Sequence, residues 1–140
     1  MLLNPMPNRR QSETFRLPVG EAGKEQTFFV TLGIVSVGNR LVINEVFLKH
    51  GKEGQALDAI CDDAGIIISK LLQTGFPVAD LCPGISILPV FDAKTEKCQP
   101  ASILGATLQL IATEQQVLDK CCGLRSSGLG LETIANLGSD

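Results

Sequence analysis

Residues 27–48 read TFFVTLGIVSVGNRLVINEVFL, and this stretch decides the fold. Its side chains are mostly β-branched, aliphatic or aromatic, and such side chains fit the pleated surface of a β-sheet. Gly38 and Asn39 interrupt the run, and glycine at the first central position suits a two-residue type II′ turn. The stretch therefore predicts a β-hairpin whose strands span 27–37 and 40–48.

A further strand is predicted before the hairpin. Residues 13–19 read ETFRLPV, so Phe15, Leu17 and Val19 alternate with other residues and share one side. Pro18 has no backbone N–H, which favours a place at the edge of the sheet. Residues 20–26 are polar and contain glycine, so we expect a turn there.

A long helix is predicted after the hairpin, from residue 53 or 54 to about residue 74. Apolar residues recur there at spacings of three and four, which is typical of one helical face: Leu57, Cys61, Ala64, Ile68 and Leu71. Three further apolar residues widen this face: Ile60, Ile67 and Leu72. We therefore expect more than half of the helix circumference to be buried. Glycine at 75 and proline at 77 form a stop signal.

The second half of the chain predicts a short helical turn over 78–82 and a second long helix over 100–120. Pro100 is expected at the first position of that helix, where its missing N–H costs nothing. The predicted inner face of the helix consists of Leu104, Leu108, Ile111 and Ala112. This order of elements indicates an α+β fold with an antiparallel sheet of about three strands, a central hairpin and two main helices packed on one face. The predicted organisation is a flexible arm over 1–11, one domain over 12–122 and a Gly/Ser-rich tail over 123–140.

The composition indicates a globular chain. Of the 140 residues, 44% are hydrophobic and 19% are charged, as in folded rather than disordered proteins. This apolar content is high for a small protein, which has much surface, so we expect a homo-oligomer that buries part of it between subunits. The net charge of −3 and the absence of Trp and Tyr argue against nucleic-acid binding.

The sequence favours a cytoplasmic location and no membrane partner. Residues 1–11 have no apolar segment like that of a secretory signal, and no run approaches the roughly 18 apolar residues of a membrane span. The cysteines are odd in number and lack C-x-x-C spacing: Cys61, Cys82, Cys98, Cys121 and Cys122. We therefore expect reduced thiols and no structural metal, with Cys98 as the most reactive thiol because it precedes a helix.

Residues 49–54, KHGKEG, join the hairpin to the first helix and allow two interpretations. They are either a solvated turn with positive-φ glycines, or an anion site in which basic side chains flank the unpaired N–H groups of a helix start. We predict that the loop binds a phosphate-bearing ligand. Glu45 precedes it on the strand, and an ion pair is favoured there over catalysis. The candidate ligand-binding residues are Lys49, His50, Gly51, Lys52, Gly54 and Glu45.

Residues 45–54 (EVFLKHGKEG) and 63–78 (DAGIIISKLLQTGFPV) resemble the TSCPD domain. This domain occurs near the C-terminus of adenosylcobalamin-dependent ribonucleotide reductases and in stand-alone bacterial and phage proteins. The similarity covers roughly residues 9–113, and the matching residues are Glu45, Phe47, Lys52, Gly54, Ser69, Gln73, Gly75 and Pro77. One departure concerns the Cys-Pro motif of the family, because Gln99 here separates Cys98 from Pro100.

The resemblance implies a stand-alone binding module linked to nucleotide metabolism, which binds a phosphate-bearing nucleotide or a reductase-related partner. A chain of this length cannot hold the catalytic barrel of a reductase, so no cofactor is expected and any activity would be associated with a reductase. The alternatives are an accessory or regulatory subunit that contributes to ribonucleotide reduction, and a purely structural oligomer. A hydrolase is disfavoured, because Ser69 has only His50 as a possible base.

Overall fold

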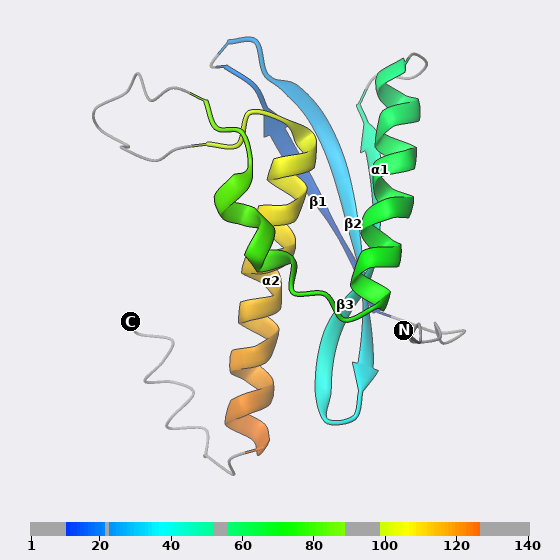
Figure 1. The fold of residues 1–140 in the computed structure, drawn as a ribbon, viewed down its shortest axis with the longest axis vertical. Helices are drawn as coiled ribbons and strands as arrows, with labels where there is room; N and C mark the ends of the chain where they lie inside the picture. The colour runs from blue at the N-terminus through cyan, green and yellow to red at the C-terminus, as the bar shows by residue number, and fades with distance from the viewer. Residues whose placement is uncertain (1–10, 22, 52–55, 89–98, 127–140) are drawn as a thin grey trace.

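The computed structural model describes residues 11–21, 23–51, 56–88 and 99–126. Within these ranges the chain forms an antiparallel sheet of three strands in the order β1-β2-β3: β1 (Gln11–Val19), β2 (Gln26–Val37) and β3 (Arg40–His50). Three helices follow: α1 (Ala56–Gln73), the 3₁₀ helix η1 (Val78–Gly84) and α2 (Ile103–Ser126). The predicted α+β fold with a central hairpin is therefore confirmed, as Figure 1 shows.

The hairpin has the predicted two-residue turn. Val37 pairs with Arg40, so Gly38 and Asn39 alone close the loop. Gly38 has φ of +63°, in the left-handed region that the hairpin turns require and that glycine reaches without strain. β1 pairs only with β2, so the strand that contains Pro18 is an edge strand, as predicted.

A bulge on β3 aligns its buried side chains. Gly33 of β2 pairs with Glu45, but the next residue, Ile34, pairs with Ile43, so Asn44 is the extra residue. Without the bulge, Ile43 and Val46 would point to opposite faces, because side chains alternate along a strand. With it, both are 1% exposed and belong to the same core.

The core lies between one face of the sheet and the helices. All three strands, α1, η1 and α2 contribute to a single cluster of buried residues: Val19, Phe28, Val30, Leu32, Ile34, Ile43, Val46, Leu48, Cys61, Ile68, Leu72, Val78, Ile103, Leu108 and Ile111. The prediction that both main helices pack on one face of the sheet is thus confirmed. Figure 1 shows that α1 runs beside β3, whereas α2 and η1 lie on the other side of the view.

The buried face of α1 is narrower than predicted. Ile60 and Ile67 are 58% and 67% exposed, although the spacing placed both in the core. The reason is that α1 packs chiefly on β3, at the edge of the sheet, so only one side of it is covered. Leu104 of α2 was likewise predicted to be buried and is 46% exposed.

The start of α2 also differs from the prediction. Pro100 does not begin the helix, because its backbone forms a β-bridge with Ile87. Ser102 caps the helix instead: its Oγ accepts a hydrogen bond of 3.2 Å from Gly105 N. The end of α1 agrees with the prediction, since Gly75 follows it with φ of +84°. The predicted start of that helix lies outside the described residues.

Candidate ligand-binding groove between β3 and α1

α1 lies against the free edge of β3, and a groove with a volume of about 400 Å³ runs between them. Gly65 allows this close approach, because a Cβ atom there would lie only 3.2 Å from Val46 O. The walls carry Glu45, Phe47 and Lys49 from β3, and Asp62, Ile66, Ser69, Lys70 and Gln73 from α1. The groove thus combines two lysines, two carboxylates and apolar surface.

The structure brings together only some of the predicted site residues. Glu45 and Lys49 both line the groove. His50 points to the opposite face of β3, where its ring packs against Phe28 with the ring centroids 4.9 Å apart. Strand alternation therefore separates the side chains of Lys49 and His50, although they are neighbours in the sequence.

The remaining predicted residues belong to the loop after β3. Gly51 N donates a hydrogen bond of 2.8 Å to Thr27 O, and a Cβ atom at Gly51 would lie 2.9 Å from the same oxygen. Glycine is thus required at 51 by close backbone approach. Lys52 and Gly54 lie outside the described residues, so the prediction of an anion-binding loop remains a prediction.

Ser69 forms part of the backbone pairing of the sheet edge. Its Oγ accepts a hydrogen bond of 2.9 Å from Val46 N and donates one of 3.1 Å to Val46 O. This hydroxyl therefore replaces the strand that would otherwise pair with β3 at this point. The sequence identified Ser69 as a residue of the TSCPD motif and as a disfavoured nucleophile, but strand pairing through a helical side chain has no local sequence signal.

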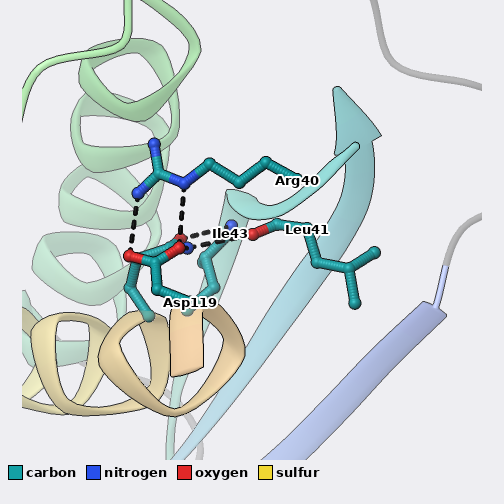
Figure 2. Close-up of polar contacts among 5 residues, drawn as sticks. Arg40, Leu41, Ile43 and Asp119 are labelled. Carbon is teal, nitrogen blue, oxygen red and sulfur yellow. Dashed lines mark hydrogen bonds and ion pairs between the residues drawn. The ribbon is translucent and has the colours of Figure 1, made fainter. Parts of the chain in front are cut away.

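Gln115 of α2 closes the other end of the same edge. Its amide accepts a hydrogen bond of 2.9 Å from Ile43 N and donates one of 2.9 Å to Leu41 O. It also donates to Asp119, which forms a bidentate ion pair with Arg40 at 2.8 and 3.0 Å (Figure 2). The Arg40 hydrogen bonds lower the pKa of the Asp119 carboxyl, with a smaller effect from Gln115, whereas partial burial opposes them.

A second cavity, of about 240 Å³, lies beside this ion pair. Its floor is apolar and includes Leu72, Val78 and Ile111, while Arg40 and Asp119 line its rim. The two charges at the rim already neutralise each other in a bidentate pair. This cavity is thus less suited to a charged ligand than the groove between β3 and α1.

The groove opens onto the face of the sheet opposite the core. On this open face, Phe29 pairs with Arg16 on one side and with Lys49 on the other, so the three side chains form a row across the strands. Phe29 is 39% exposed, and Phe47 in the next row is 53% exposed. Among the described residues, neither Arg16 nor Lys49 forms an ion pair. We call these four residues the aromatic-basic patch.

The cysteines do not form a reactive or metal-binding centre in the part of the chain that the structure describes. Burial raises the pKa of the Cys61 thiol, and the carboxylates of Asp58 and Asp62 raise it further. Cys121 is exposed and Cys82 half-buried, while Cys98 lies outside the described residues. No cluster of three or more His, Cys, Asp or Glu side chains that could hold a metal ion occurs among the described residues.

Comparison with known proteins identifies the family. The family model of the TSCPD domain matches residues 4–114, which is most of the chain. The protein belongs to the TSCPD family. Neither a curated protein nor a solved structure matches the chain. None of the helices in the described ranges is long and apolar enough to span a membrane.

Of the residues that carry the TSCPD resemblance, those within the described ranges line the groove or its neighbouring cavity. Glu45, Phe47, Ser69 and Gln73 line the groove. Gln73 also donates a hydrogen bond of 3.4 Å to Asn44 O, at the bulge of β3. Gly75 and Pro77 line the second cavity. The sequence features of the TSCPD domain therefore coincide with the packing of α1 against the edge of β3.

Proposed function

We propose that this TSCPD protein is a non-catalytic binding module of nucleotide metabolism that holds a phosphate-bearing nucleotide in the groove between β3 and α1. The observation that carries the proposal is that Lys49 and Phe47 belong both to the groove and to the aromatic-basic patch. Their position joins a charged groove to an exposed aromatic surface. A nucleotide has matching parts, since it combines a flat base, a hydroxyl-bearing sugar and an anionic phosphate.

The phosphate is assigned to the lysines. Lys49 and Lys70 stand on opposite walls of the groove, one on β3 and the other on α1. Arg16 adds a third cation on the open face, on the other side of Phe29 from Lys49. A phosphate group that replaces water near these side chains would form charge-assisted hydrogen bonds, which are stronger than those between neutral groups.

The sugar and the base are assigned to the other groups. The carboxylates of Glu45 and Asp62 also line the groove, and carboxylates are common acceptors for ribose hydroxyls. Their negative charges balance the positive charges of the two lysines. The groove therefore suits a ligand that has both anionic and neutral parts better than it suits free phosphate. Phe47 and Phe29 offer exposed rings, and stacking of a base on an aromatic ring contributes about 1–3 kcal/mol.

The geometry supports binding rather than catalysis by this chain alone. The Ser69 hydroxyl is engaged with both polar backbone atoms of Val46, so it is not poised as a nucleophile. The Cys61 thiol is buried with a raised pKa, which disfavours the reactive thiolate. Neither group has the activating base that nucleophilic catalysis requires among its hydrogen-bond partners in the described residues.

The test is isothermal titration calorimetry with nucleoside triphosphates, the corresponding nucleosides and inorganic phosphate. We expect the wild type to bind a nucleoside triphosphate. Lys49→Ala and Lys70→Ala should each bind it at least tenfold more weakly, a loss of about 1.4 kcal/mol in binding free energy. Lys24→Ala is the matched control, because Lys24 is an exposed lysine in the turn between β1 and β2. Equal affinity of all three variants, or no heat with any nucleotide, would contradict the proposal.

A second candidate function is that of an accessory or regulatory subunit for ribonucleotide reduction. It is favoured by membership of the TSCPD family, given the occurrence of this domain in adenosylcobalamin-dependent reductases. The two functions make different predictions, since an accessory subunit should bind a reductase that lacks its own TSCPD domain. Co-elution with such a reductase, together with a change in its turnover, would support the second function.

A further inference from the structure

The solvent side of α1 is unusually apolar. Ile60, Ile66 and Ile67 are 58%, 61% and 67% exposed, and these are the three highest values among the exposed large apolar side chains of the described residues. All three lie on one helix of a small domain. A surface helix normally carries polar residues on the side that faces away from the core, so this side is expected to be covered.

Ile60 and Ile67 belong to a continuous stripe of exposed residues, whereas Ile66 lines the groove. Successive helical residues are about 100° apart, so residues separated by three, four or seven positions share one side. Ala56, Ile60, Asp63, Ile67 and Lys70 follow this spacing, and each is exposed. We call them the α1 stripe. Ile67 lies about 160° around the helix from Gly65, which contacts β3, so the stripe points away from the sheet.

We infer that the α1 stripe is the interface of a homodimer in which two α1 helices pack antiparallel about a twofold axis near Ile67. In this arrangement Ile67 packs against the same residue of the other copy. Both Ile67 side chains would then be removed from water, and burial of apolar surface favours association. The inference does not depend on the proposed nucleotide function. The two proposals share Lys70, but Ile67, on which the dimer centres, does not line the groove.

The charged residues of the α1 stripe indicate that a second copy of this chain covers it. About a twofold axis near Ile67, Asp63 is opposite Lys70 of the partner subunit, and the reciprocal pair forms as well. The alternative register, which pairs Ile60 with Ile67 of the partner subunit, would bring the two Asp63 carboxylates together. A surface that is self-complementary in both shape and charge is typical of twofold interfaces.

The dimer leaves the groove accessible. The twofold axis that relates two antiparallel helices is perpendicular to the plane that contains both helix axes. The rotation therefore leaves every residue on its own side of this plane. The two grooves would then open on the same side of the dimer, one on each side of the helix pair. Lys70 would lie at the boundary between interface and groove.

The test is sedimentation equilibrium of the purified full-length chain. The wild type is expected to be a dimer at micromolar concentration, and Ile67→Glu is expected to raise the dissociation constant at least tenfold. Val117→Glu is the matched control, because Val117 is a 50% exposed apolar residue on α2. A wild type that is monomeric, or an Ile67→Glu variant as dimeric as Val117→Glu, would overturn the proposal.

The register is tested by charge reversal. Asp63→Lys and Lys70→Asp should each weaken the dimer, whereas the double variant should restore it, because the opposite charges again face each other. The charge-reversal variants also test whether the α1 stripe forms the dimer interface if Ile67→Glu does not fold. Failure of the double variant to regain dimerisation would exclude the antiparallel pairing near Ile67. Far-UV circular dichroism of every variant verifies that the monomer is still folded.

Discussion

Single residues on β3 have roles that depend on which face of the strand they occupy. Lys49 lies on the open face beside Phe29, and His50 lies on the core face against Phe28. The sequence grouped these neighbours in one basic loop, but the pleat of the strand gives them separate surroundings. Arg16 lies on the same face beyond Phe29, and Lys70 lies on the opposite wall of the groove from Lys49.

The ion pair of Arg40 and Asp119 predicts an acid dependence of stability. Because the folded-state pKa of Asp119 is lowered, the pair stabilises the protein above the unfolded-state pKa of about 4 and is lost as the pH falls through the folded value. Both side chains are largely exposed, at 58% and 41%, so solvent screening limits the effect to below about 1 kcal/mol. Urea unfolding at neutral pH and at a pH below the folded-state pKa of Asp119 measures this contribution to stability.

Asp119→Asn should lower stability at neutral pH and reduce the loss that the protein suffers on acidification. Asp80→Asn, at an exposed aspartate of η1, serves as the control. If acidification destabilised Asp119→Asn and the wild type equally, the ion pair would have no part in the acid dependence.

At the scale of elements, the free edge of β3 is closed by helical side chains rather than by a fourth strand. Ser69 and Gln73 of α1 and Gln115 of α2 all form hydrogen bonds with the β3 backbone. An edge strand with unpaired N–H and C=O groups is a site for association with other strands. These contacts attach both helices to β3. They also occupy backbone groups of the edge that could otherwise pair with another strand.

Ser69→Ala should destabilise the protein by about 1–3 kcal/mol, because Val46 would lose its partner for both N–H and C=O. Ser36→Ala is the matched control, since Ser36 is exposed and, within the described residues, its hydroxyl bonds only Gly38 O in its own turn. The measurement is the free energy of unfolding from urea denaturation. Equal effects of the two substitutions would mean that the Ser69 bonds add nothing to stability.

Gly65→Ala tests the close approach of the same two elements. In a free helix this change is favourable by about 1 kcal/mol, because alanine is the better helix former. Here we expect the opposite sign, since the new Cβ would lie 3.2 Å from Val46 O and would push α1 away from β3. An increase in the midpoint of urea unfolding would show that the helix moves without cost.

At the scale of the whole molecule, one core joins all the elements, and Cys61 lies inside it. Its side chain is 1% exposed and its pKa is raised by burial. We therefore expect iodoacetamide to modify exposed Cys121 readily and Cys61 only after global unfolding. Mass spectrometry of peptides after timed labelling with increasing urea distinguishes the two sites. Modification of Cys61 at the rate of Cys121 in the absence of urea would contradict the observed core.

The local elements follow from the sequence because short-range physics specifies them. The Gly38-Asn39 turn, the alternation in residues 13–19 and the stop at Gly75 each depend on the conformational preferences of a few neighbouring residues. The α+β class follows in turn from the order of these elements. Family membership was also evident from the motif around Glu45 and Ser69, because the spacing of its residues can be seen in the chain itself.

The groove and the exposed stripe were decided by tertiary structure. Helical periodicity placed Ile60 and Ile67 with the core residues, but it cannot say how much of a helix its neighbours will cover. α1 packs at the edge of the sheet, so a wide apolar helix is covered on one side only. In the same way, the bulge at Asn44 and the pairing of Ser69 with Val46 join residues far apart in sequence. Such contacts depend on long-range register, which no local pattern of residues encodes.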